Sequence, residues 1–169
     1  PTLTHALLPG SAAINAGDAS AIAGMDGVPV YDQRGAGYDR VIYDRIDIGA
    51  FERQLLTIVV DTKVDENDGD HAAGDLSLRE AVAIANASLG ADVTIEFSPT
   101  LAGETILLTQ GQMRVSNGVR SVGLGAGQLT IDASGSDPTP EVNNLDGSRV
   151  FAFQASNSLV AEYSISGLT

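Results

Sequence analysis

The side chains best placed for chemistry lie in an acidic loop at residues 61–70. Four hard oxygen donors fall within it: Asp65, Asn67, Asp68 and Asp70. Oxygen donors of this kind are the ligands that calcium prefers. The spacing departs from an EF-hand loop, because Gly69 falls one place early and Glu80 is too distant to supply the closing ligand. A solvated loop of mutually repelling acids is the favoured interpretation, and a calcium site is the second.

The rest of the sequence offers no recognisable catalytic set. The two histidines, His5 and His71, do not fall in a metal-binding or nucleophile spacing, and cysteine is absent. Carboxylates are so abundant that any pair chosen for glycoside cleavage would be arbitrary. We therefore predict no catalytic residue and no cofactor other than calcium, and the sequence favours a protein that is not an enzyme.

The charge of the chain limits its partners. Asp and Glu number 22 against 9 Lys and Arg, which gives a formal net charge of −13. This field repels nucleic acid and anionic membranes, so neither is expected as a main partner. No apolar run approaches the roughly 18 residues that a membrane span needs, so no membrane insertion is expected.

One helix is predicted, at residues 77–87. Ser77 followed three residues later by Glu80 is the pattern of a capping box, in which each side chain binds the backbone N–H of the other residue. One apolar stripe then follows at helical spacing: Leu78, Ala81, Val82 and Ala85. The sequence therefore predicts a short amphipathic helix with one buried face.

Two arginines are predicted to have structural roles. Arg79 lies beside the capping box and off the apolar stripe, so we expect its guanidinium to bind strand-end carbonyls or an acid such as Asp75. Arg34 lies in a polar turn, and we expect it to bind Asp47 or Asp18 and so to fix that turn to the following strand.

Short strands account for the other apolar runs. They are expected at 47–52, with Ile48, Ala50 and also Phe51 as candidates for a core, and at 54–60, 93–97, 105–109, 113–115, 119–122, 129–131, 150–153 and 159–165. Such spacing fits a sandwich, a barrel or a β-helix. The strands are very short and Asn117-Gly118 is an isolated hairpin signal, so we predict a right-handed parallel β-helix (a solenoid). The helix would cap its open first coil.

The segment LTIVVDTKVDENDGDHAAGDLSLREAVAIANASLGADVTIEFSP, with the later LTIDASGSDPTPEVNNLDGSRVFAF, resembles the CSLREA-type domain over about residues 54–169. Leu76 stands where that family's naming motif has cysteine. The resemblance implies the N-terminal cap and first coils of a β-helix, a module that opens β-helical repeats in large bacterial surface and secreted proteins.

Upstream, LLPGSAAINAGDAS, DQRG and DIGAFE resemble the closing segment of such β-helices, known as the choice-of-anchor Q type, over about residues 1–53. Ala12 replaces a proline of that pattern and Asn15 replaces its first aspartate. A closing segment that precedes an opening segment implies a junction between two tandem β-helix units of a longer repeat protein.

The function expected from these observations is a structural or adhesive segment of a large extracellular bacterial protein. Its stiff surface would contact a polysaccharide or a cell-surface protein, and its neighbours would be β-helix units of the same chain. One alternative is part of a β-helical polysaccharide lyase or hydrolase whose active coils lie outside residues 1–169. Another is a surface module stabilised by calcium at the acidic loop. The expected location is extracellular or on the bacterial cell surface.

Overall fold

The computed structural model describes residues 3–8, 11–42, 45–88, 91–139, 142, 147–154 and 163–169. The chain forms two compact units. The first unit comprises Pro1–Leu56 and Leu89–Asp92, and the second comprises Thr57–Ser88 and Val93–Thr169.

Turns make up most of the described part of the first unit. Tyr31 and Asp39 form an isolated antiparallel bridge. Strand β1 (Gln54–Val60) begins in this unit and continues into the second. Backbone hydrogen bonds over long sequence distances hold the turns together, among them Gly17 N–H to the carbonyl of Ile46 at 2.8 Å. The tertiary contacts of its turns, rather than a sheet, therefore define this unit.

The strand predicted at residues 47–52 is not formed. Ile48 is 55% exposed and Ala50 is also exposed, whereas Phe51 is buried. The carboxylates at the two ends of the segment explain the difference, because Glu52 accepts the backbone N–H of Asp47 and Asp47 accepts the backbone N–H of Arg53. These bonds close the segment on itself, so the two-residue alternation of a strand does not apply.

One α-helix and eight strands are found among the described residues. After β1 they are α1 (Leu78–Ala87), β2 (Ala91–Phe97), β3 (Glu104–Leu107), β4 (Met113–Val115), β5 (Val119–Val122), β6 (Leu129–Asp132), β7 (Phe151–Phe153) and β8 (Tyr163–Ser166). Short 3-10 helices occupy Pro99–Leu101 and Ser134–Ser136. The predicted strands other than 47–52 therefore form with small shifts at their ends, although residues 159–162 of the last one lie outside the described residues.

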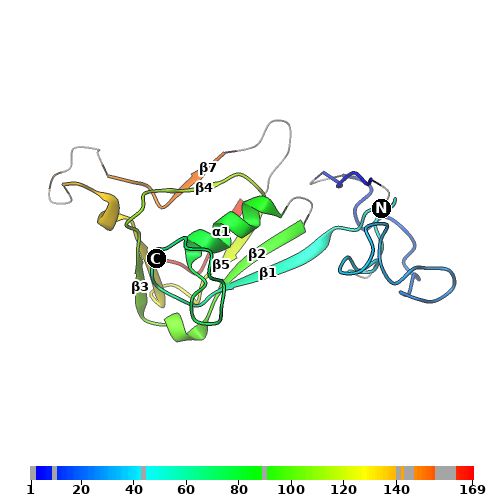
Figure 1. Cartoon of the computed structure of the whole chain (residues 1–169), viewed down its shortest axis with the longest axis horizontal. Helices are drawn as coiled ribbons and strands as arrows, with labels where there is room; N and C mark the ends of the chain where they lie inside the picture. The colour runs from blue at the N-terminus through cyan, green and yellow to red at the C-terminus, as the bar shows by residue number, and fades with distance from the viewer. Residues whose placement is uncertain are drawn as a thin grey trace. The chain divides into compact units, whose positions relative to one another are not determined.

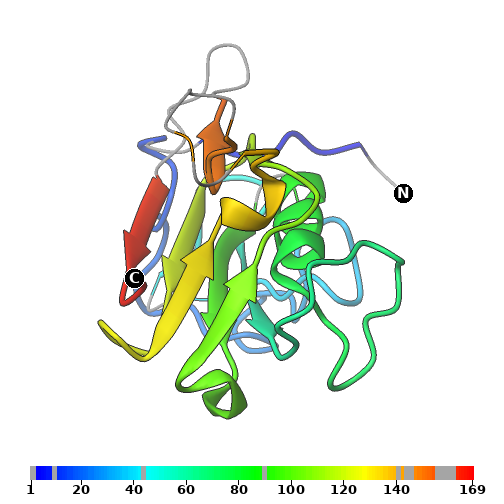
Figure 2. The same cartoon turned by 90° about the vertical axis from the view of Figure 1, so that its left-hand side faces the viewer.

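The strands pair into three sheets, with orders β1-β2-β5-β8, β3-β6 and β4-β7. The pairs β2–β5, β5–β8, β3–β6 and β4–β7 are all parallel. Along the chain, β2, β3 and β4 enter the three sheets in turn, β5, β6 and β7 repeat that order, and β8 returns to the first sheet. Figure 2 shows β3 in green and β6 in yellow side by side. A mainly β fold with parallel sheets and one α-helix is confirmed.

Alternate residues of the strands point into the interior of the second unit. In β2 the buried positions are Val93, Ile95 and Phe97. The parallel register places Val93 beside Val119 of β5 and Met113 of β4 beside Phe151 of β7. Apolar side chains thus stack on one another across neighbouring strands. Aliphatic residues rather than aromatic rings supply most of the core.

Helix α1 begins as predicted. Ser77 is its N-cap, and both bonds of the capping box with Glu80 are present. The predicted apolar stripe is buried: Leu78, Ala81, Val82 and Ala85. The helix packs against β4 (Figure 1). Burial of a leucine or valine contributes about 1.5–3 kcal/mol, so tertiary packing rather than helix propensity supplies most of its stability.

The end of α1 is fixed by side-chain amides. Asn86 donates to the carbonyl of Arg114 at 2.8 Å and accepts the backbone N–H of Ser116 at 2.8 Å. Asn117 donates to the carbonyls of Ala85 and of Ser88 at 3.1 and 3.0 Å. The turn between β4 and β5 therefore binds two carbonyls at the C-terminal end of the helix, those of Ala85 and of the C-cap Ser88.

Candidate functional site

The acidic loop is anchored at Asp65, whose side chain is 1% exposed. Arg79 Nε donates to Asp65 Oδ1 at 2.7 Å and Arg79 Nη2 to Asp65 Oδ2 at 3.0 Å. The backbone N–H groups of Thr109 and Gln110 also donate to Oδ2, at 2.7 and 2.9 Å. Arg79 Nη2 in addition donates to the carbonyl of Gly111 at 2.8 Å. Asp65 and Arg79 therefore join the loop, the helix and the turn after β3.

The prediction for Arg79 is confirmed in kind, since its guanidinium binds a carbonyl and an acid. The acid is Asp65, however, and not Asp75. Burial raises the pKa of Asp65, but its hydrogen bonds from Arg79 and from two backbone N–H groups outweigh this effect and hold the pKa below its usual 3.8. Asp65 is therefore a charged structural residue.

The loop has a second anchor at Glu80, which is 1% exposed. Its Oε2 accepts the backbone N–H of Ser77 and its Oε1 that of Gly69, both at 3.0 Å. The Ser77 hydroxyl donates to the carbonyl of Glu66 at 2.8 Å. Burial raises the pKa of Glu80, but these backbone hydrogen bonds outweigh it and the pKa lies below the usual value. The capping box thus also fixes the loop in front of the helix.

The four residues predicted as calcium ligands do not converge. Asp65 faces Arg79, while Asn67, Asp68 and Asp70 are exposed. Asp68 and Asp70 each accept the backbone N–H two residues further on, as in Asx turns. Among the residues that the structure describes, no three His, Cys, Asp or Glu side chains are placed to hold a metal ion. The calcium prediction therefore has no preformed site in this part of the chain.

Arg34 is the centre of a second cluster, in the first unit. Its guanidinium donates to Asp32 Oδ2 from Nε at 2.9 Å and from Nη2 at 2.6 Å, and to the carbonyl of Glu52 at 2.6 Å. It also lies 3.9 Å from the ring centroid of Tyr38 and 3.7 Å from that of Phe51. A buried acid, a carbonyl and two aromatic faces thus bind one arginine.

The predicted partners of Arg34 are wrong. Asp47 instead accepts the backbone N–H groups of Asn15 and Arg53, at 2.7 and 2.9 Å, and Asp18 binds Ser20. Arg34 instead binds Asp32, two residues before it in the same turn, because the turn places the Asp32 carboxylate next to the guanidinium. Asp47 is nonetheless a structural residue, since it is 1% exposed and holds two separate segments.

Sequence reasoning missed Asp32, Glu52 and Arg40. Asp32 and Glu52 are 5% and 0% exposed. Arg40 donates to Glu52 Oε2 at 3.4 Å and to the carbonyl of Asp47 at 3.2 Å. The recurrence of acids at the edges of two glycine-containing motifs, DQRG and DIGAFE, was the signal available for this cluster.

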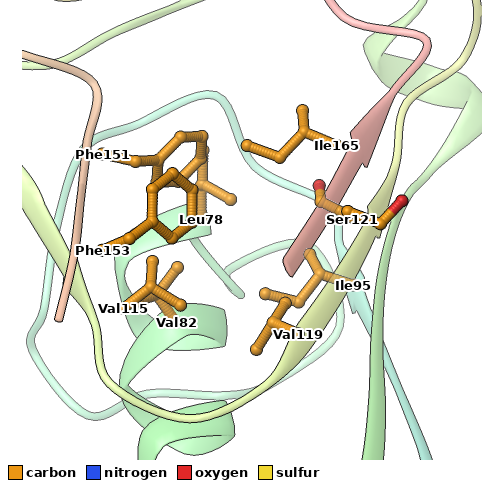
Figure 3. A pocket seen from close by; sticks show the side chains of 10 residues that line it. Leu78, Val82, Ile95, Val115, Val119, Ser121, Phe151, Phe153 and Ile165 are labelled. Atoms are coloured by element: carbon orange, nitrogen blue, oxygen red, sulfur yellow. The ribbon is translucent and has the colours of Figure 1, made fainter. Parts of the chain in front are cut away.

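The described residues enclose a small cavity in the second unit and an open cleft in the first. In the second unit, the side chains of α1, β2, β4, β5, β7 and β8 leave a cavity of about 10 Å³, to which Leu78, Val115 and Phe151 contribute (Figure 3). That volume accepts at most one water molecule. In the first unit, an open cleft of about 400 Å³ is lined in part by Tyr31 and Arg40. Neither hollow presents a recognisable catalytic constellation.

Comparison with known proteins found no match to this chain. No family model matches the chain, and no curated protein or solved structure matches it. None of the described helices is long and apolar enough to cross a membrane. The functional conclusion therefore depends on the geometry of the chain itself.

Proposed function

We propose that the chain is a structural or adhesive segment of a large extracellular bacterial β-helical protein. Residues 54–169 form the N-terminal cap and first coils of a right-handed β-helix, and residues 1–53 close a preceding unit, as the CSLREA-type and choice-of-anchor Q resemblances imply. The observation that carries the proposal is the repeated order in which the chain enters the three sheets.

Each pass through the three sheets is one coil of the proposed solenoid. The strands β2, β3 and β4 supply the first coil, and β5, β6 and β7 the second. The registers of all three sheets support this reading, because each strand of the second coil is parallel to its counterpart in the first. Coils bound in this way resist bending, since a bend would have to break hydrogen bonds in several sheets together.

The helix is proposed to protect the open end of the first coil. Such an end exposes apolar side chains and unpaired backbone groups, which invite association with another sheet edge. Three features support a protective role for α1: its buried apolar stripe, its packing against β4 and its fixed start at Ser77 and Glu80. The Asp65–Arg79 ion pair then locks the helix to the turn that follows β3.

Contacts with partners are proposed to occur on the outward faces of the strands. Arg114 on β4 and Arg120 on β5 are exposed there. Their register partners on the neighbouring strands are small or hydroxylated: Ala152 for Arg114, and Thr94 and Ser164 for Arg120. Such a surface suits hydrogen bonding to a glycan or to another protein, and binding of this kind needs no catalytic group.

The test is to immobilise the full chain and to apply neutral polysaccharides, acidic polysaccharides and extracellular matrix proteins. We expect saturable retention of at least one class, with no unsaturated or reducing ends released from it. Heat-unfolded protein is the control. Release of sugar products in proportion to protein concentration would overturn the non-enzymatic assignment, and equal retention by the unfolded control would overturn the adhesive one.

A further inference from the structure

The first unit buries more negative than positive charge around Glu52. Three carboxyl groups lie within this cluster, those of Asp32, Asp47 and Glu52, with 5%, 1% and 0% of each residue exposed. Two guanidinium groups, those of Arg34 and Arg40, contact the acidic residues of the cluster. A buried carboxylate without a compensating cation is costly, and a carboxyl group in such a place takes up a proton instead.

The three acids differ in how many donors their carboxyl oxygens have. Asp32 accepts hydrogen bonds from Nε and Nη2 of Arg34 and from the backbone N–H groups of Arg34 and Glu52. Asp47 accepts two backbone N–H groups, one at each carboxylate oxygen. Glu52 is less well supplied, because Oε2 accepts one backbone N–H at 2.8 Å and a long contact of 3.4 Å from Arg40, and buried Oε1 has no partner.

We propose that Glu52 is a proton-binding site, so that the folded chain keeps this carboxyl neutral at pH values where an exposed glutamate is ionised, and that the turns bound to Glu52 respond to pH. This inference does not depend on the proposed β-helical function. It rests on a cluster of three acids, two arginines and one unpartnered buried oxygen.

The electrostatics of the cluster act in the same direction. Burial is the largest influence on the pKa of Glu52 and raises it above the usual 4.5, and the negative charges of Asp47 and Asp32 raise it further. The backbone N–H of Asp47 and the charge of Arg40 lower the pKa but do not compensate. Arg34 is committed to Asp32 and to the backbone carbonyl of Glu52, so it does not contact the Glu52 carboxylate.

The sign of the pH effect follows from proton linkage. Between the pKa of Glu52 in the unfolded chain and its higher pKa in the folded chain, the folded state binds more protons. The contribution of Glu52 to the stability of the first unit therefore falls as the pH rises through this interval. On further rise, the ionised carboxylate faces Asp47 and Asp32 without solvent, and the turns that Glu52 joins through its Oε2 and its backbone N–H loosen.

The direct test is a carbon-13 NMR titration of the full chain with labelled glutamate carboxyl groups, assigned through the backbone. We expect the Glu52 resonance to titrate at a higher pH than that of Glu96, which is exposed on β2. A Glu52 resonance that titrates with or below Glu96 would overturn the proposal.

A variant pair gives the second test. Glu52→Gln keeps the shape of the neutral acid but cannot ionise, so its melting temperature minus that of the wild type should increase as the pH rises above the usual glutamate range. Glu96→Gln is the matched control and should show no such increase. A melting-temperature difference that does not change with pH would show that Glu52 binds protons equally in the folded and unfolded chains, and a difference that falls as the pH rises would show that the fold uses the carboxylate charge; either result would overturn the proposal. If Glu52→Gln does not fold, the NMR titration of the wild type still decides.

Discussion

Removal of the Arg79 guanidinium should destabilise the second unit strongly. Arg79→Ala deletes both hydrogen bonds to Asp65, whose side chain is 1% exposed, and the bond to the carbonyl of Gly111. Loss of one partner from a buried ion pair costs about 3–5 kcal/mol. Because Asp65 keeps the backbone N–H groups of Thr109 and Gln110, we expect a value near the lower limit, about 3 kcal/mol.

Thermal and urea unfolding, followed by circular dichroism, measures this loss. For a chain of this size, about 3 kcal/mol corresponds to a fall in melting temperature of roughly 6–12 °C. Since the chain has two compact units, hydrogen exchange of the α1 amides should be recorded as a probe of the second unit alone. Arg120→Ala, on an exposed position of β5, is the matched control and should change stability by less than about 0.5 kcal/mol.

Acid provides an internal check on the mechanism. At pH values low enough to protonate Asp65, its carboxyl group no longer needs a cation. The difference in free energy of unfolding between wild type and Arg79→Ala should therefore become smaller. In the double variant Arg79→Ala/Asp65→Asn, the loss should be smaller than the sum of the two single losses. A loss below about 1 kcal/mol for Arg79→Ala, or a gap that does not change with pH, would refute a buried charge-paired anchor.

Three further outcomes are expected. Ser77→Ala removes the N-cap hydroxyl of α1 and should cost about 1 kcal/mol in urea unfolding, whereas Ser77→Thr keeps a hydroxyl that can accept and donate and should retain more of the stability; equal stability of all three chains would contradict the cap. Arg34→Ala leaves buried Asp32 without its cation and should cost about 3–5 kcal/mol, with Arg34→Lys intermediate because it lacks the planar fork; a Lys variant as stable as wild type would show that the fork is not used. Asp65 has a lowered pKa in the folded state, so its contribution is complete above the unfolded pKa and is lost as the pH falls below about 4; acid unfolding curves of wild type and Asp65→Asn that have the same pH dependence would contradict this.

Local patterns explain why much of the second unit was predictable. Ser77 and Glu80 specify the start of the helix through bonds that span three residues, and the strands carry their own apolar alternation between turn residues. The parallel pairing followed from the scarcity of hairpin signals. These features depend on neighbours in sequence, so they could be read before the fold was known.

Partners across the fold could not be predicted in the same way. Asp65 binds Arg79, 14 residues away, and the Thr109 and Gln110 amides, 44 and 45 residues away, and no periodicity signals such pairings. The segment 47–52 misled because its alternation resembles a strand, while its terminal carboxylates instead bind nearby backbone N–H groups. The acidic loop resembled a metal site because the sequence shows its four oxygen donors close together. It does not show that one of them, Asp65, faces Arg79 inside the fold.

The repeated parallel order of the strands is the central claim, and cysteine cross-linking tests it most directly. The chain has no native cysteine, so pairs can be introduced at register partners, one pair per sheet: Thr105 with Thr130, Arg114 with Ala152, and Arg120 with Ser164. Adjacent strands lie about 4.8 Å apart, which suits a disulfide, whereas a shift of two residues takes the Cα atoms beyond about 7 Å. We predict rapid oxidation of all three pairs and little oxidation of the shifted pairs Thr105 with Asp132 and Arg120 with Ser166. Equal oxidation of matched and shifted pairs, or folded variants in which the matched pairs stay reduced, would contradict the stacked-coil architecture.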